Sequence, residues 1–260
     1  IKNIAVLGVT IIIAVIASKD FLSMHKNEEI AKNPSITEIK MLSQYSPRLK
    51  GTSLDTEVYF FDSGIEGGTF LILGGTHPNE TAGLVAATAL IENISVEEGR
   101  VITIPSTNNS GSSHTSPLDG MQDFCTLTLE DGTERTFRVG NRLTNPVHQW
   151  PDMNYYEGTS GRTIYGTENA EVRNVNRLYY GTEDGVLTEQ VCYGIYNLIN
   201  EENVSIAMDM HEGSPEFLYL DCTMVNMKRD NTTAMSIASD MALSMNFDDL
   251  DMRAEYSGVT

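Results

Sequence analysis

The chain has 260 residues, of which 40% are hydrophobic, enough for the core of one α/β domain or two small ones. Its 36 acidic residues outnumber its 17 Lys and Arg residues and give a formal net charge of −19 at pH 7. This charge repels phosphate groups and therefore argues against nucleic acid, and against an anionic membrane surface, as a partner.

An apolar segment stands at the amino end. After Lys2, residues 4–17 are uncharged and apolar apart from Thr10. Such a run is short for a bilayer span but typical of a signal-peptide core, and the small residue Ala17 suits a cleavage site. We therefore expect residues 1–20 to be a signal peptide or, alternatively, a retained membrane anchor. The folded domain then covers residues 21–260, and the protein is exported to a periplasmic, extracellular or membrane-anchored location.

Three elements are predicted next. Residues 35–49 carry apolar side chains at helical spacing, which predicts a surface helix. The apolar positions are Ile36, Ile39, Leu42 and Tyr45. Residues 56–61 and 69–73 read as two antiparallel strands joined by a glycine-containing turn.

A helix over residues 79–94, capped by Asn79, and a strand over residues 101–104 are expected to follow. This alternation of strand and helix favours an α/β fold with a mixed, largely parallel sheet flanked by helices.

Residues 108–169 interrupt this order and form a predicted β-rich insertion. Residues 124–139 alternate around an Asp-Gly turn, which indicates a β-hairpin. The rest is rich in small polar residues and has no period. Two interpretations remain open, a lid that shapes the substrate pocket and a purely structural insertion. His114 and His148 lie inside it and are not predicted as ligands, because nothing fixes either near a strand end.

The stretch from residue 69 to residue 83 delivers two candidate metal ligands to a turn. The apolar strand ends in Gly74 and Gly75, which let the backbone turn without a side-chain clash. His77 follows on the loop, and Glu80 is expected in the first turn of the next helix. Both side chains then lie at the carboxyl end of a strand, where open α/β sheets bind ligands.

A third candidate ligand occupies a matching position. After a helix expected over residues 185–200, an apolar strand over residues 204–210 ends at His211, as the earlier strand leads to His77. Two histidines and one glutamate form a zinc set with an open fourth position, which is the pattern of a catalytic site. Zinc would lower the pKa of a bound water to roughly 7 and polarise a carbonyl, so hydrolysis of an amide or ester follows. Asp209 could orient a ligand histidine or serve in a salt bridge.

Three blocks of the sequence resemble the signature of the zinc carboxypeptidase superfamily. They are Gly-Thr-His-Pro-Asn-Glu at residues 75–80, the pair Asn176 and Arg177, and Asp-Met-His at residues 209–211. The first block is more similar to the succinylglutamate desuccinylase/aspartoacylase branch than to the digestive carboxypeptidases. The resemblance covers residues 56–260 apart from the insertion.

The resemblance implies that His77, Glu80 and His211 bind zinc, and that Asn176 and Arg177 hold a carboxylate of the substrate. A guanidinium pairs with a carboxylate through two parallel hydrogen bonds, which agrees with that role. A surface ion pair is the other interpretation of Arg177.

Two functional groups of the family have no clear counterpart. For the additional arginine that stabilises the oxyanion, Arg162 and Arg173 are the candidates. The general base is a glutamate on a later strand, and neither Glu212, Glu216 nor Glu255 has a matching context. We expect the base to lie beyond Thr260, in a domain truncated at its C-terminal end.

The sequence thus predicts an exported zinc-dependent hydrolase that cleaves an amide bond next to a carboxylate. Deacylation of an N-acyl amino acid is the first expectation, and a zinc carboxypeptidase acting on peptide C-termini is the alternative. The partner is a small molecule or peptide with a free carboxylate. From another class, a non-catalytic exported ligand-binding module on the same fold is the competing hypothesis.

Overall fold

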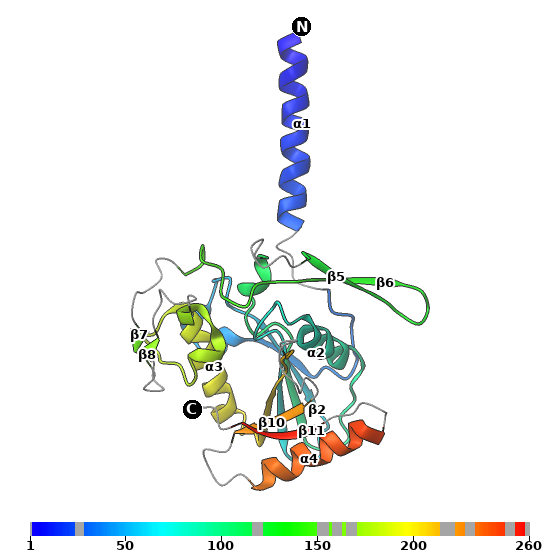
Figure 1. The fold of residues 1–260 in the computed structure, drawn as a ribbon, viewed down its shortest axis with the longest axis vertical. Coiled ribbons are helices and arrows are strands. Elements are labelled where there is room, and N and C mark those ends of the chain that lie inside the picture. The colour runs from blue at the N-terminus through cyan, green and yellow to red at the C-terminus, as the bar shows by residue number, and fades with distance from the viewer. Residues whose placement is uncertain are drawn as a thin grey trace. The chain divides into compact units, whose positions relative to one another are not determined.

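In the computed structural model, the described residues are 2–23, 29–115, 122–149, 156–157, 163–164, 171–213, 222–226, 232–247 and 253–257. The chain divides into two compact units, Ile1–His211 and Glu212–Thr260 (Figure 1). The predicted metal ligands His77, Glu80 and His211 all belong to the first unit.

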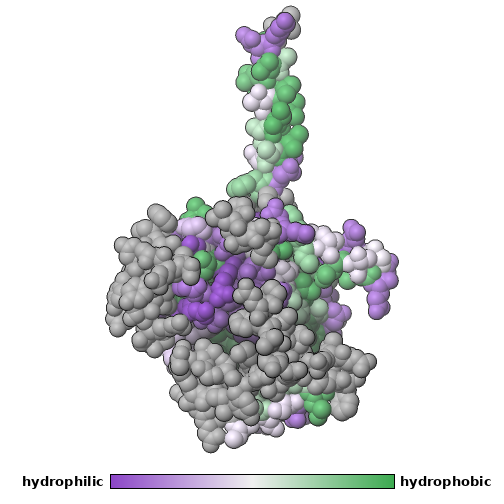
Figure 2. All heavy atoms as spheres, in the orientation of Figure 1, coloured by the Kyte–Doolittle hydropathy of each residue, from purple (hydrophilic) through white to green (hydrophobic). Residues whose placement is uncertain are grey.

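The amino-terminal apolar segment forms helix α1 (Lys2–Ser23). Its residues 2–22 are exposed, and Figure 2 shows that most of its surface is hydrophobic. Among the described residues, α1 is the one helix whose length and composition would allow it to cross a membrane. A signal sequence has the same properties, so the helix is compatible with both expectations for this segment.

The first unit is built on a five-stranded sheet in the order β1-β2-β4-β3-β9. Its strands are β1 (Glu38–Met41), β2 (Glu57–Asp62), β3 (Thr69–Leu73), β4 (Arg100–Ile104) and β9 (Ile206–Asp209). Strand β3 pairs in parallel with β4 and β9, whereas β2 is antiparallel to both β1 and β4. The predicted mixed sheet is therefore confirmed. Strands β2 and β3 run in opposite directions but do not form a hairpin, because β4 lies between them.

Helices α2 (Thr81–Asn93) and α3 (Leu187–Glu201) cover opposite faces of this sheet. Successive side chains of a strand point to opposite faces. On β2, Phe60 packs in the larger core cluster together with Ile195 of α3. Its neighbour Phe61 packs in the smaller cluster with Ile91 of α2. At β2 the sheet is thus buried on both faces, and the ends of the strands are the place for a site.

The helix expected over residues 35–49 is absent, and this prediction was wrong. The segment forms β1 and two short 3-10 turns, Leu42–Gln44 and Pro47–Leu49. Pro47 lacks an N–H donor and cannot continue a helix, so it begins the second turn instead. Leu42 and Tyr45 are buried in the larger core cluster, while Ile39 on the edge strand is 51% exposed. The apolar residues at this spacing therefore lie on a strand and two turns, and they do not share one face of a helix.

Part of the insertion is described. Its hairpin consists of β5 (Phe124–Thr128) and β6 (Glu134–Arg138), which pair antiparallel as predicted. Arg135 joins the hairpin to α2, with Nη2 2.6 Å from Glu92 Oε1. Two short paired strands, β7 (Tyr156–Glu157) and β8 (Thr163–Ile164), are the described residues between residue 150 and residue 170.

The second unit contains β10 (Cys222–Asn226), α4 (Thr232–Phe247) and β11 (Arg253–Ser257). Its two strands pair in parallel, which makes this unit a strand-helix-strand motif. Glu255 lies on β11, whereas Glu216 lies outside the described residues.

Candidate metal centre

The loop after β3 carries the first two predicted ligands. Gly75 has a φ of 61°, in the left-handed region that glycine adopts without strain, and turns the chain back toward α2. His77 is buried in this loop with an exposed fraction of 2%. The N-cap of α2 is Glu80, not the predicted Asn79, and its side chain makes no cap hydrogen bond. Its carboxylate is instead engaged by two histidines.

Close packing of α2 on the end of β9 brings the third predicted ligand to the other two. A Cβ added at Gly83 would lie 2.6 Å from the carbonyl oxygen of Met210, so only glycine permits this approach. His211 follows directly after Met210. The start of α2, which carries Glu80, therefore lies against the chain just before His211.

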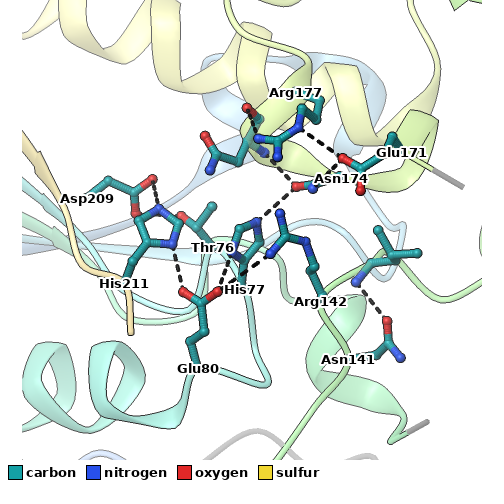
Figure 3. A network of polar contacts seen from close by, with 12 residues as sticks. Thr76, His77, Glu80, Asn141, Arg142, Glu171, Asn174, Arg177, Asp209 and His211 are labelled. Carbon is teal, nitrogen blue, oxygen red and sulfur yellow. Dashed lines mark hydrogen bonds and ion pairs between the residues drawn. The ribbon is translucent and has the colours of Figure 1, made fainter. Parts of the chain in front are cut away.

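Glu80 stands between the two imidazoles, as Figure 3 shows. His77 Nδ1 lies 2.7 Å from Glu80 Oε1, and His211 Nδ1 lies 2.7 Å from Glu80 Oε2. The two rings are 4.8 Å apart between centroids. One ligand atom from each of the three residues lies within 4.8 Å of the others. The structure thus brings together all three residues that the sequence singled out.

Asn174 fixes the orientation of His77. Its Oδ1 lies 3.0 Å from His77 Nε2 and accepts the backbone N–H of Asn176 at 3.1 Å. An oxygen that faces two donors leaves Nε2 of His77 as the protonated nitrogen. Nδ1 then faces Glu80 and is the nitrogen through which His77 would bind a metal.

Asp209 orients the ring of His211, as Asn174 orients that of His77. Its Oδ2 lies 3.1 Å from His211 Nε2, and its Oδ1 accepts a hydrogen bond from the hydroxyl of Thr76 at 2.7 Å. A carboxylate accepts hydrogen bonds only, so Nε2 carries the hydrogen here as well. Both rings therefore present Nδ1 to the same carboxylate.

The carboxylate of Glu80 and the imidazole of His211 stabilise each other's charge. Burial raises the pKa of Glu80, but hydrogen bonds and charge from His211 and His77 outweigh it and lower the pKa to about 2. Burial lowers the pKa of His211, but hydrogen bonds to Asp209 and Glu80 outweigh it and raise the pKa to about 10. Two imidazole nitrogens and a carboxylate oxygen are ligands that zinc accepts, so these residues fit the ion that the sequence predicts.

The predicted carboxylate-binding pair lies on a 3-10 turn, Val175–Arg177, capped by Asn174. Arg177 Nε lies 3.0 Å from Glu171 Oε2 and its side chain is partly exposed. Asn176 is exposed at the same turn. Because Asn174 contacts His77, this turn joins the arginine to the histidine cluster.

Arg142 is a site residue that the sequence analysis missed. Its Nη1 lies 3.9 Å from Glu80 Oε1. The insertion places it there, since the N–H of Gly140 donates to the carbonyl oxygen of Pro78, next to His77, at 3.0 Å. The Asn-Arg pair at residues 141–142 repeats the pair at residues 176–177, which was the one available signal in the sequence.

Of the two arginines proposed from the sequence, Arg173 lies in the described part of the chain. Arg173 donates from Nη1 to the carbonyl oxygen of Thr144 at 2.6 Å and so braces the insertion. Arg162 lies outside the described residues. Within the described part of the chain, the metal-ligand grouping consists of His77, Glu80 and His211, and His114 and His148 are not part of it.

No protein-family model matches the sequence, and no curated protein sequence matches it either. Solved structures do resemble the chain, at low identity. An aspartoacylase family protein from Mesorhizobium loti has 17% identity and a TM-score of 0.46, covering 84% of this chain and 55% of that one. A succinylglutamate desuccinylase/aspartoacylase from Rhodobacter sphaeroides has 15% identity and a TM-score of 0.44, covering 82% and 53%.

A metallo-carboxypeptidase from Burkholderia cenocepacia has 10% identity and a TM-score of 0.47, covering 92% of this chain and 52% of that one. The chain thus spans about half the length of the solved chains described here.

Proposed function

We propose that the protein is a zinc-dependent hydrolase that cleaves an amide bond next to a carboxylate. The observation that carries this proposal is the pair of histidine Nδ1 atoms, each 2.7 Å from one oxygen of Glu80. His77, Glu80 and His211 would hold the ion. When bound, zinc supplies a Lewis acid that polarises the scissile carbonyl and activates water.

Two arginines are assigned separate roles, one in substrate binding and one in stabilising charge. Arg177, with Asn176 beside it, binds the carboxylate of the substrate, because a guanidinium offers a rigid pair of donors. Arg142, whose Nη1 is 3.9 Å from Glu80, stabilises the negative charge that develops on the carbonyl oxygen. Glu80 and Asp209 each face an imidazole, so we assign neither as the general base.

Deacylation of an N-acyl amino acid is the preferred reaction, since the Thr-His-Pro-Asn-Glu block is similar to the deacylase branch. The second candidate is a carboxypeptidase acting on peptide C-termini, because the hydrogen bond from Gly140 to Pro78 holds the insertion beside His77, where it could contact a longer substrate. The exposed apolar helix α1 supports export, with the protein secreted or anchored at its amino end.

The first test is zinc per chain, measured by elemental analysis of the purified protein beside a His77→Ala variant. We expect about one zinc per chain in the wild type and loss of it in the variant. N-acyl amino acids and peptides are then compared as substrates. Zinc and carboxylate binding without turnover would favour the ligand-binding module over the enzyme, and absence of zinc would remove the proposal.

A further inference from the structure

Glu171 contacts both the proposed carboxylate-binding arginine and Asn174, the residue that orients His77 (Figure 3). Its Oε2 accepts a hydrogen bond from Asn174 Nδ2 at 2.9 Å. The same oxygen lies 3.0 Å from Arg177 Nε. One carboxylate oxygen therefore contacts both halves of the proposed site.

Asn174 connects Glu171 to His77, and its side-chain amide can make these contacts in only one orientation. Asn174 Oδ1 accepts the backbone N–H of Asn176 and faces His77 Nε2, so the amide nitrogen of Asn174 must point to Glu171. Asn174 is fully buried, with an exposed fraction of 0%. A buried amide that loses its acceptor costs free energy or changes its orientation. Either response would disturb the ring of His77.

The link from Glu171 to Arg177 is an ion pair in which both side chains are partly buried, with exposed fractions of 25% and 28%. The contact engages Nε, and Nη1 lies 3.5 Å from the carbonyl oxygen of Asn176. A charged partner at Nε fixes the plane of the guanidinium, and a fixed plane is what two-point recognition of a carboxylate needs.

We propose that Glu171 is a positioning residue that couples the carboxylate-binding arginine to the metal ligand His77. It acts through Asn174 on the ring of His77 and directly on the guanidinium of Arg177. This inference rests on the proposed function, because it assumes zinc at His77 and a substrate carboxylate at Arg177. It assigns Glu171 no contact with the substrate.

The effect of Glu171 on the metal ligand His77 is tested by the zinc affinity of the metal-free protein, measured in competition with a chromophoric chelator. Loss of an outer hydrogen-bond partner lowers metal affinity by about 10-fold to 100-fold, and we expect Glu171→Ala to fall near the lower figure. Because Glu171 acts through Asn174, the double variant with Asn174→Ala should bind zinc no more weakly than Asn174→Ala alone. Wild-type affinity in Glu171→Ala, or additive losses in the double variant, would overturn the coupling.

The effect of Glu171 on Arg177 is tested by the ratio of the KM values for an N-acetyl amino acid and for its carboxamide. We expect Glu171→Ala to reduce the preference for the carboxylate, and to have no further effect in an Arg177→Ala background. Glu171→Gln keeps an oxygen for Asn174 but loses the charge. It should restore most of the zinc affinity while the carboxylate preference stays reduced. An unchanged preference in both Glu171 variants would contradict the role.

Glu92→Ala is the matched control, since it breaks another carboxylate-arginine pair, with Arg135, away from the cluster. It should leave zinc affinity and carboxylate preference unchanged. If it lowers them as much as Glu171→Ala does, the effect is general destabilisation and the proposal fails. The zinc content of the wild-type protein distinguishes failure of the proposed function from failure of the role of Glu171. No zinc in the wild type removes the proposed function and the role of Glu171 together, whereas zinc binding that survives Glu171→Ala removes only the latter.

Discussion

At the scale of the residue, each histidine of the cluster works through two nitrogens with different partners. Nε2 is held by Asn174 or Asp209, and Nδ1 faces Glu80. Because Nε2 is engaged on the outer side, Nδ1 is the nitrogen that a metal held beside Glu80 would meet. The proposed metal site would therefore be preorganised by hydrogen bonds from Asn174 and Asp209, which are not among the proposed ligands.

Replacing His211 by alanine should abolish stoichiometric zinc binding, because two remaining ligands do not complete a zinc site. Elemental analysis after dialysis against a weak chelator gives the zinc content. His148→Ala is the control, since His148 contacts Ser110 and is not part of the metal-ligand grouping among the described residues. Full zinc content in His211→Ala would show that the ligand set is wrong.

Arg142 and Arg177 should respond differently to substitution. Loss of one group that stabilises a developing oxyanion costs about 10²-fold to 10³-fold in kcat, so Arg142→Ala should lower kcat with little change in KM. Arg177→Ala should instead raise KM for substrates with a free carboxylate and spare their carboxamides. Steady-state kinetics on both substrate types separates the roles. Equal losses on both types in Arg177→Ala would defeat its assignment.

At the scale of the element, the contact between α2 and the end of β9 sets the distance between Glu80 and His211. Gly83→Ala would place a Cβ 2.6 Å from the carbonyl oxygen of Met210. Overpacking of this kind costs about 1–3 kcal/mol of unfolding free energy. We also expect weaker zinc binding, because α2 must move away from β9.

Gly68→Ala is the control for that variant, because its added Cβ would meet Ser205 at 3.4 Å, an ordinary contact. Its unfolding free energy should stay within about 0.5 kcal/mol of the wild type. Urea denaturation of both variants measures the difference. Wild-type stability and zinc affinity in Gly83→Ala would show that the close approach is not required.

The insertion is fastened to α2 by Glu92, which makes stability depend on pH. The hydrogen bond from Arg135 lowers the pKa of Glu92 below its usual 4.5, although burial opposes the shift. A carboxyl group with a lowered pKa in the folded state stabilises the protein above its unfolded pKa, and this contribution disappears as pH falls through the folded pKa.

Glu92→Gln should therefore lower the unfolding free energy by about 1–2 kcal/mol near neutral pH, because it replaces a hydrogen bond to a charged group, worth about 1.5–3 kcal/mol, by a neutral one worth about 0.5–1.5 kcal/mol. The difference from the wild type should shrink as the solution becomes acidic. Urea midpoints at several pH values give the comparison. A difference that grows on acidification would contradict the assigned pair.

At the scale of the whole molecule, α1 has no buried residue between residues 2 and 22. Deletion of residues 2–17 should therefore leave zinc content and cooperative unfolding of the remaining chain unchanged. If the segment is a cleaved signal, mass spectrometry of the exported protein should find an amino terminus near Ser18. Retention of Lys2 in the membrane fraction would instead support the anchor.

The sequence by itself was sufficient for features that depend on neighbouring residues. The hairpin of residues 124–139 follows from alternation and an Asp-Gly turn. The positions of His77 and His211 follow from apolar strands that end just before them, because parallel strands place their carboxyl ends at one edge of a sheet. Local pattern also located Glu80, although its place as the N-cap was misassigned to Asn79.

Only the tertiary structure decided which distant residues meet these histidines. Arg142 arrives from the insertion and Asn174 from a 3-10 turn, and neither contact leaves a periodic trace in the sequence. The same limit explains residues 35–49, where apolar spacing suited a helix but edge pairing with β2 and Pro47 imposed a strand and turns. Local propensity constrains a segment, but contacts between segments far apart in the chain select the partner of each side chain.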